Sequence, residues 1–204
     1  MARHENLRRR GPTRKVLPRI LIVCEGTKTE PGYFEDLRQL YRRVVELELS
    51  PGGVPKTLVT RAAEMKKDAE RAAKAAKDEN LLYDEVWCVF DIDDHPGVGD
   101  AKQQARENGI NLAISNPCFE LWVLLHFQDQ RANINRTNLR ALCRRYLPGY
   151  KKDLPVDKLS PHHDQATARA RSLDAWQHEQ GREHANPSTG VYRLTQSIRG
   201  FDEA

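Results

Sequence analysis

Three carboxylates in this sequence have the spacing expected of a single divalent-metal site. Glu25 directly follows one apolar run, and Asp91 and Asp93 follow another. Asp91 and Asp93 are two positions apart, so both side chains point to the same side of an extended segment. Oxygen ligands with no adjacent cysteine or histidine cluster favour Mg²⁺ or Mn²⁺ over zinc. Either motif alone could be a loop or a helix cap, but together the carboxylates would repel one another without a cation.

Two short apolar segments must position these carboxylates. Residues 19–23 and 86–90 are rich in β-branched and apolar side chains, which is typical of buried parallel strands. Hydrophobic periodicity predicts further strands over 45–49 and 110–114, and helices from about residue 30, over 57–78 and over 100–108. This alternation predicts an α/β fold with a mainly parallel sheet flanked by helices. Ligands of such sheets bind outside the carboxyl ends of the strands, where Glu25 and Asp91 are expected.

The chain length of 204 residues is compatible with one domain. We expect a single domain over 18–204, with an α/β core over 18–117 and a mostly helical layer over 118–204, where four helices are predicted over 118–127, 137–146, 162–180 and 187–198. Residues 1–17 are expected to be a basic flexible arm, because residues 1–19 carry seven Lys/Arg against one Glu. That arm could bind phosphates or could be a solvated tail.

The composition indicates the cellular compartment of the protein. No stretch approaches the roughly 20 apolar residues that span a bilayer, and no apolar run follows the N-terminal arginines as in a signal peptide. We therefore expect a cytoplasmic protein that does not associate with membranes. The four cysteines are far apart and lack CxxC spacing, so free thiols are predicted.

Several longer motifs resemble a known family. Residues 20–26, ILIVCEG, followed by Thr29-Glu30 and then Asp91-Ile92-Asp93, resemble the Toprim metal-binding module of topoisomerases, bacterial primases and OLD-type nucleases. Residues 86–96, VWCVFDIDDHP, 115–122, SNPCFELW, and 186–189, NPST, resemble the RloB family of bacterial defence-associated proteins more closely. The resemblance extends from about residue 18 to residue 200. It implies a Toprim-like fold, divalent-metal phosphodiester chemistry and a part in phage defence, often beside an AAA-type ATPase partner.

Other polar residues near these motifs each have two interpretations. Glu120 begins a predicted helix and could favour the helix dipole or face the metal. Asn116 could cap that helix, which is the favoured interpretation. Alternatively, without binding the metal itself, it could donate a hydrogen bond to a metal-binding carboxylate or to a phosphate. Glu30 has capping-box spacing to Thr27, although the resemblance places an acidic residue in this loop. Lys28 could neutralise a phosphate or could be solvated.

Three histidines are weighed in the same way. His95 follows the acidic cluster and is the one best placed for proton transfer or a phosphate contact. His126 lies in an apolar segment and is interpreted as a half-buried structural residue. The third, His163, lies in His162-His163-Asp164, which could bind metal but follows Ser160-Pro161 and is interpreted as a helix start.

A basic helix is predicted in the C-terminal half. Its basic residues have Tyr146 and Tyr150 among them, a composition suited to nucleic-acid binding and base stacking; they are Arg136, Arg140, Arg144, Arg145, Lys151 and Lys152. The alternative is a solvated helix face. With Arg8, Arg9 and Arg10 of the N-terminal arm, the helix favours a nucleic-acid partner.

These observations lead to two functional hypotheses. The first is an Mg²⁺- or Mn²⁺-dependent nuclease acting on DNA or RNA, tRNA included, in antiphage defence, with Glu25, Asp91 and Asp93 as ligands. The second is a catalytically silent sensor that binds metal and nucleic acid and works with a partner ATPase. A homo-oligomer is compatible with either hypothesis.

Overall fold

A mainly parallel sheet lies at the centre of the molecule. The computed structural model describes residues 17–50, 54–92, 97–150 and 154–200. Within these ranges the sheet has five strands in the order β2-β1-β3-β4-β5, and only β5 is antiparallel to its neighbour. The strands are β1 Arg19–Cys24, β2 Val44–Leu49, β3 Glu85–Asp91, β4 Asn111–Asn116 and β5 Ser188–Thr189. The predicted α/β class is thus confirmed, and the architecture is consistent with a Toprim-like fold.

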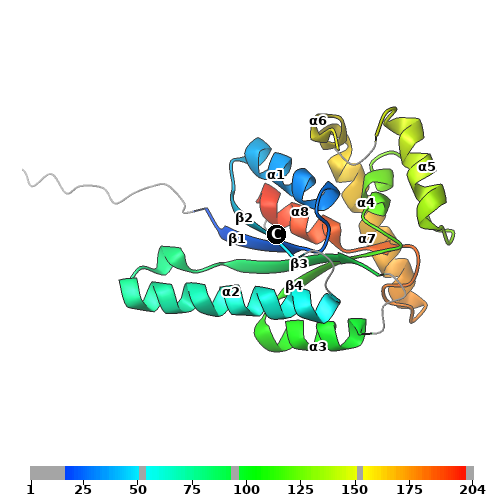
Figure 1. The fold of residues 1–204 in the computed structure, drawn as a ribbon. Helices are drawn as coiled ribbons and strands as arrows, with labels where there is room; N and C mark the ends of the chain where they lie inside the picture. The colour runs from blue at the N-terminus through cyan, green and yellow to red at the C-terminus, as the bar shows by residue number, and fades with distance from the viewer. Residues whose placement is uncertain (1–16, 51–53, 93–96, 151–153, 201–204) are drawn as a thin grey trace, which may run out of the picture.

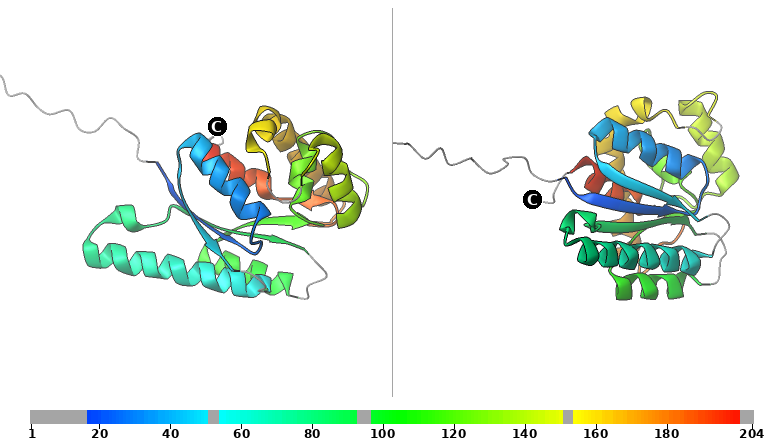
Figure 2. Two further views of the ribbon diagram at one scale, coloured as in Figure 1. Left: turned by 45° about the horizontal axis from the view of Figure 1, so that its top comes forward. Right: turned by 60° about the vertical axis from the view of Figure 1, so that its left-hand side comes forward.

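Helices cover both faces of this sheet, giving three layers (Figure 1; Figure 2). One face is covered by α2 Pro55–Ala76 and α3 Val98–Asn108. The other face carries the remaining helices: α1 Thr29–Tyr41, α4 Glu120–Leu125, α5 Arg136–Tyr146, α6 Val156–Leu159, α7 His163–Glu179 and α8 Val191–Arg199. Short 3₁₀ turns, η1 Glu79–Leu81 and η2 Ser160–His162, complete the described elements.

The apolar run in β1 explains why both faces must be covered. Successive strand residues point to opposite faces, so Leu21 and Val23 pack with α2 and α3, while Ile20 and Ile22 pack with the larger helical layer. All four of these side chains are fully buried. Burying such a strand on both sides requires parallel neighbours and crossover helices, which is what the alternation of elements predicted.

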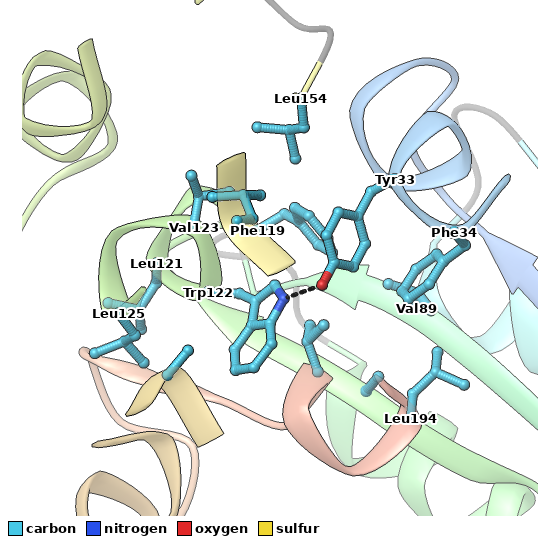
Figure 3. Close-up of a cluster of buried hydrophobic side chains, with 14 of the residues drawn as sticks. Tyr33, Phe34, Val89, Phe119, Leu121, Trp122, Val123, Leu125, Leu154 and Leu194 are labelled. Atoms are coloured by element: carbon cyan, nitrogen blue, oxygen red, sulfur yellow. Dashed lines mark hydrogen bonds between the residues drawn. The ribbon is translucent and has the colours of Figure 1, made fainter. Parts of the chain in front are cut away.

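Aromatic side chains join α4 to α1 in the larger core (Figure 3). Trp122 donates an Nε1–H hydrogen bond of 2.9 Å to the Tyr33 hydroxyl, and both side chains are buried. Phe119 packs edge-on against Tyr33 and Phe34, with ring centroids 5.5 and 6.0 Å apart. The bond satisfies two polar groups that would otherwise be costly in an apolar core.

Two histidines are buried beside Trp122. The His126 ring lies 4.7 Å from the Trp122 ring and 6.1 Å from the His163 ring, and its Nδ1 bonds the Trp122 carbonyl. Burial lowers the pKa of His126 to about 3 and that of His163 to about 4, so both are neutral near pH 7. His126 is more deeply buried than the half-buried position expected, but its role is structural. His163 begins α7, as its position after Pro161 predicted.

Two local predictions are wrong. The Thr27–Glu30 capping box does not form, because the N-cap of α1 is Lys28 and no side chain caps that end. The helix expected from residue 187 begins only at Val191, and Ser188–Thr189 form a strand instead. This strand depends on tertiary pairing: Ser115 and Thr189 share a 3.0 Å hydroxyl hydrogen bond, and Gly190 N–H donates to Ile114 O.

The buried histidines predict a steep acid dependence of stability. Their folded-state pKa values lie below the ordinary value of about 6.5, so the stability they contribute is present above pH 6.5 and is lost as the pH falls. Urea unfolding of the wild type and of His126→Phe should give free energies of unfolding whose difference shifts in favour of the variant as the pH falls from 6 to 5. The wild-type slope should exceed that of the variant by up to about 1.4 kcal/mol per pH unit. Parallel slopes would contradict a neutral buried His126.

Candidate functional site

Parallel pairing brings Glu25 and Asp91 to one edge of the sheet. β1 and β3 are neighbours with Cys24 opposite Val89, and the Glu25 N–H donates to Val89 O at 3.1 Å. Asp91 is the last residue of β3, and its side chain is 18% exposed. The juxtaposition expected from the two strand ends is therefore present.

Glu30 reaches the same edge from the first turn of α1. Its carboxylate lies directly against Gly26, where an added Cβ would collide with both carboxylate oxygens. A residue without a side chain is thus required at position 26 for Glu30 to fold back towards the end of β1. Helix capping does not hold Glu30 in place, which removes the structural explanation considered for it.

Glu120 is the first residue of α4 and is almost completely buried, with its side chain 8% exposed. Arg140 donates to Glu120 Oε1 at 2.8 Å, and the Tyr150 hydroxyl donates to the same oxygen at 3.4 Å. Burial by itself would raise the pKa of Glu120, but hydrogen bonds from Cys118 and Arg140 and the charge of Arg140 hold it below the ordinary value. Glu120 is therefore a buried, ionised carboxylate.

Asp91 experiences the combined charge of these groups. Its pKa is raised, first by burial and then by the charges of Glu30, Glu120 and Glu25, while Arg136 opposes the rise. Four carboxylates thus converge from four separate elements: the end of β1, the start of α1, the end of β3 and the start of α4.

Arg136 belongs to the basic helical region predicted from the sequence, but its position at the carboxylate cluster was not predicted. It is the first residue of α5, and its guanidinium lies 3.4 Å from Asp91 Oδ2 and donates to Pro117 O at 3.1 Å. The predicted basic helix included this region, but a contact between residues 45 positions apart leaves no local signal. Tyr150 was expected to stack on bases and is instead buried, 6% exposed, against Glu120.

The donor set is compatible with a hard divalent cation. It consists of carboxylate oxygens. Burial is the largest cause of the raised pKa of Asp91, and a cation would relieve the repulsion from neighbouring carboxylates that adds to it. Among the described residues, however, no three His, Cys, Asp or Glu side chains are already arranged to hold a metal ion. Asp93 and His95 lie outside the described residues.

Asn116 has a different role from the one favoured by the sequence. The N-cap of α4 is Phe119, and no side chain caps this helix. The Asn116 amide instead donates to the His184 carbonyl at 2.8 Å. Asn116 thereby connects the end of β4 to the loop before β5, because the short β4–β5 pairing places that loop alongside.

The predicted nucleic-acid-binding residues are dispersed. Lys28 is exposed at the start of α1, and Arg144 and Arg145 are exposed in the last turn of α5. Arg140 lies on the same helix but pairs with Glu120. The described part of the chain does not include Arg8, Arg9, Arg10, Lys151 and Lys152.

Comparison with models of known protein families assigns the chain to a family. A family model described as RloB-like protein matches residues 20–198. The chain belongs to the RloB-like family. No curated protein and no solved structure gives a significant match.

The RloB-like region contains every described member of the carboxylate cluster. Its SNPCFELW segment, residues 115–122, runs from the last two residues of β4 into α4. One stretch therefore supplies the Ser115–Thr189 contact, Glu120 and the buried Trp122.

Two properties expected from composition can be compared with the structure. All four cysteines, Cys24, Cys88, Cys118 and Cys143, are buried free thiols, as predicted. None of the helices within the described ranges has the length and apolar character needed to cross a membrane.

The Glu120–Arg140 pair can be tested by a double-mutant cycle. Arg140→Met leaves the buried Glu120 carboxylate without its cation and should lower the free energy of unfolding by about 1.5 kcal/mol. Adding Glu120→Gln should recover most of this loss, because the uncompensated charge is then removed. Arg144→Met, one turn along the same helix and exposed, is the control and should change stability by less than about 0.5 kcal/mol. Strictly additive effects at positions 120 and 140 would contradict the pairing.

Proposed function

We propose that the protein is a divalent-metal-dependent nuclease that cleaves phosphodiester bonds in DNA or RNA as part of antiphage defence. The observation that supports this proposal best is the convergence of Glu25, Glu30, Asp91 and Glu120 at the carboxyl edge of a parallel sheet. Membership of the RloB-like family agrees with the resemblance to Toprim proteins, which implies phosphodiester chemistry. We further propose that it acts in the cytoplasm.

The carboxylates at the ends of β1 and β3 are the best candidates for metal ligands. Glu25 and Asp91, with Asp93, would hold Mg²⁺ or Mn²⁺. Glu30 is a further candidate, because its charge raises the pKa of Asp91. When bound, the cation would activate water and stabilise charge on the scissile phosphate. Glu120 is the weaker candidate, because one of its oxygens is already hydrogen-bonded to Arg140 and Tyr150. Its contact with Arg140 instead suits a role in holding α5 in position.

Arg136 is the residue best placed to bind a substrate phosphate. Its guanidinium lies beside Asp91 at the sheet edge, is 34% exposed, and is anchored by its Nε–H to the Pro117 carbonyl. The guanidinium would pair with a phosphate oxygen when a cation neutralises Asp91. Arg144, Arg145 and Lys28, with Arg8, Arg9 and Arg10, would add contacts to the nucleic-acid backbone.

The alternative is a catalytically silent subunit that binds metal and nucleic acid and transmits that state to an AAA-type ATPase. One observation favours it: the described side chains do not by themselves form a three-ligand metal site. A site completed only by a partner or by assembly into a homo-oligomer would behave in this way.

Asp91→Asn should abolish cleavage. The substitution keeps the shape of the side chain but removes the charge at the centre of the cluster, so activity on DNA, RNA and tRNA in Mg²⁺ or Mn²⁺ should fall by at least about a hundredfold. Asp68→Asn, exposed on α2, is the matched control and should cut like the wild type. Chelation by EDTA should reproduce the effect of Asp91→Asn.

Two outcomes would contradict the nuclease. Equal cleavage by the wild type and Asp91→Asn would show that the activity comes from elsewhere. Saturable Mg²⁺ and nucleic-acid binding without turnover, even with a partner ATPase supplied, would favour the silent sensor.

Glu30 can be tested separately through Gly26. Gly26→Ala should displace the Glu30 carboxylate, a flexible group, so stability should change by less than about 0.5 kcal/mol. Mg²⁺ affinity, measured by calorimetry, should weaken by about tenfold, the size of effect seen when groups that orient metal ligands are lost. Gly32→Ala on α1 is the control, because a Cβ there meets no atom within 4 Å. Unchanged affinity in Gly26→Ala would remove Glu30 from the site.

A further inference from the structure

An exposed aromatic ring lies at the end of α5. Tyr146 is the last residue of this helix and is 41% exposed, and among the described residues it is the only exposed phenylalanine, tyrosine or tryptophan. Its ring stacks flat on the ring of Phe127, with centroids 4.8 Å apart and planes inclined by 3°. Phe127 in turn contacts the His162 ring, at a centroid distance of 5.7 Å. The three rings form a ladder whose outer member is Tyr146.

The Tyr146 ring is held in one orientation. Phe127 lies against one of its faces, and its hydroxyl donates a hydrogen bond of 2.9 Å to Gln128 Oε1. Phe127 and Gln128 belong to the turn after α4, where both of their N–H groups donate to the Leu124 carbonyl. α5 packs beside α4, so the two ends of the contact are fixed to each other (Figure 1). A ring that is already immobilised loses little conformational entropy when it binds a ligand.

The second face of the Tyr146 ring is available to a planar group. Among the described residues, no other ring and no cation lies over this tyrosine. With Phe127 on one face and the hydroxyl bonded, the remaining exposure includes a flat aromatic surface. Aromatic faces of this kind bind other flat rings by stacking. The ligand is therefore expected to carry a flat ring.

The charge around Tyr146 indicates which flat ring. Arg144 and Arg145 directly precede it, are exposed, and form no ion pair with a carboxylate of the described residues. α5 contains no acidic residue at all, and its sequence, RTNLRALCRRY, holds four arginines. An aromatic face beside unpaired cations matches a ligand that has a flat ring and a negative charge next to it. A nucleotide within a nucleic-acid strand has both.

α5 also connects this ring to the carboxylate cluster. The helix begins at Arg136, which lies beside Asp91, and Tyr146 is ten positions further along. At a rise of 1.5 Å per residue, the two ends are about 15 Å apart. A stacked strand advances about 3.4 Å per nucleotide, so about four nucleotides span this length. One short strand can therefore contact both ends of α5.

We propose that Tyr146 stacks on an unpaired base of the strand whose phosphate lies at the carboxylate cluster, so that the protein binds single strands in preference to duplexes. In a duplex, both faces of each base are covered by its neighbours, and only a base outside the duplex can stack on a protein ring. Arg144 and Arg145 contact the phosphates next to that base. The inference rests on the proposed function, and it names the substrate class of the same site.

The test measures binding without cleavage. The full-length protein is titrated in EDTA with a labelled oligothymidylate of about 12 nucleotides, which exceeds the estimated span, and fluorescence anisotropy is the readout. The same strand annealed to oligoadenylate is the duplex, and a third strand of the same length consists of abasic sites. The RNA equivalents are measured in parallel. The single strand should bind about tenfold more tightly than the duplex, because stacking is worth this order of affinity per base.

Variants assign the preference to the ring. Tyr146→Ala should weaken binding of oligothymidylate by about five- to a hundredfold, and Tyr146→Leu, which is apolar but not flat, should behave like it. Tyr146→Phe keeps the ring and should bind within about twofold of the wild type. Leu82→Ala, which removes an exposed apolar side chain elsewhere, is the control and should bind like the wild type.

The abasic strand separates stacking from damage to the structure. It keeps the phosphates but offers no base, so the wild type and Tyr146→Ala should bind it equally. A loss in Tyr146→Ala that is as large on the abasic strand would overturn the stacking role. Thermal unfolding checks that each variant is folded.

The outcomes are separable from those for the nuclease. Equal affinity of the wild type and Tyr146→Ala for oligothymidylate and its RNA equivalent would overturn the inference, even if the protein cuts. Equal affinity for single strand and duplex, in both DNA and RNA, would overturn the preference for single strands. A base-dependent loss in Tyr146→Ala, in a protein that does not cut, would support the stacking role and count against the nuclease.

Discussion

The in-register parallel pairing of β1 and β3 brings like charges together at one edge of the sheet. Because Cys24 lies opposite Val89, Glu25 and Asp91 leave their strands at nearly the same level. Both strands are buried on both faces, so neither can slip by a residue without moving apolar side chains to the wrong layer. The packing of the hydrophobic core therefore forces these carboxylates to repel one another at this edge, and the surrounding elements reduce the repulsion.

The C-terminal helices reduce that cost. α5 directs Arg136 to Asp91 and Arg140 to Glu120, while the Trp122–Tyr33 hydrogen bond ties α4 to α1. Glu120 and Trp122 lie on the same short helix, which connects the aromatic core to the charged edge. The helical layer is thus a structural part of the site.

The parts of this arrangement that could be predicted are those encoded locally. Apolar runs followed by Glu25 and Asp91 predicted two strands and their shared edge, and the C-terminal end of α3 at Gly109 followed from glycine in a left-handed conformation. β5 could not be found, because two residues have no periodicity and this strand depends on pairing with β4. The Arg136–Asp91 and Asn116–His184 contacts join segments 45 and 68 residues apart, which only the folded chain brings together. For Asn116, the local capping preference lost to a tertiary carbonyl acceptor.

The charge balance at the edge argues for a divalent ligand over a monovalent one. The described cluster has four carboxylates, Glu25, Glu30, Asp91 and Glu120, against two guanidiniums, Arg136 and Arg140, so four minus two leaves a net charge of about minus two when all are ionised. Protonation of Asp91 would remove only one of these charges, and burial already favours it. A divalent cation would neutralise the remainder and free Arg136 from Asp91. The guanidinium would then be the positive group adjoining the cation, which is where the phosphodiester of the proposed nuclease reaction would need a second positive charge.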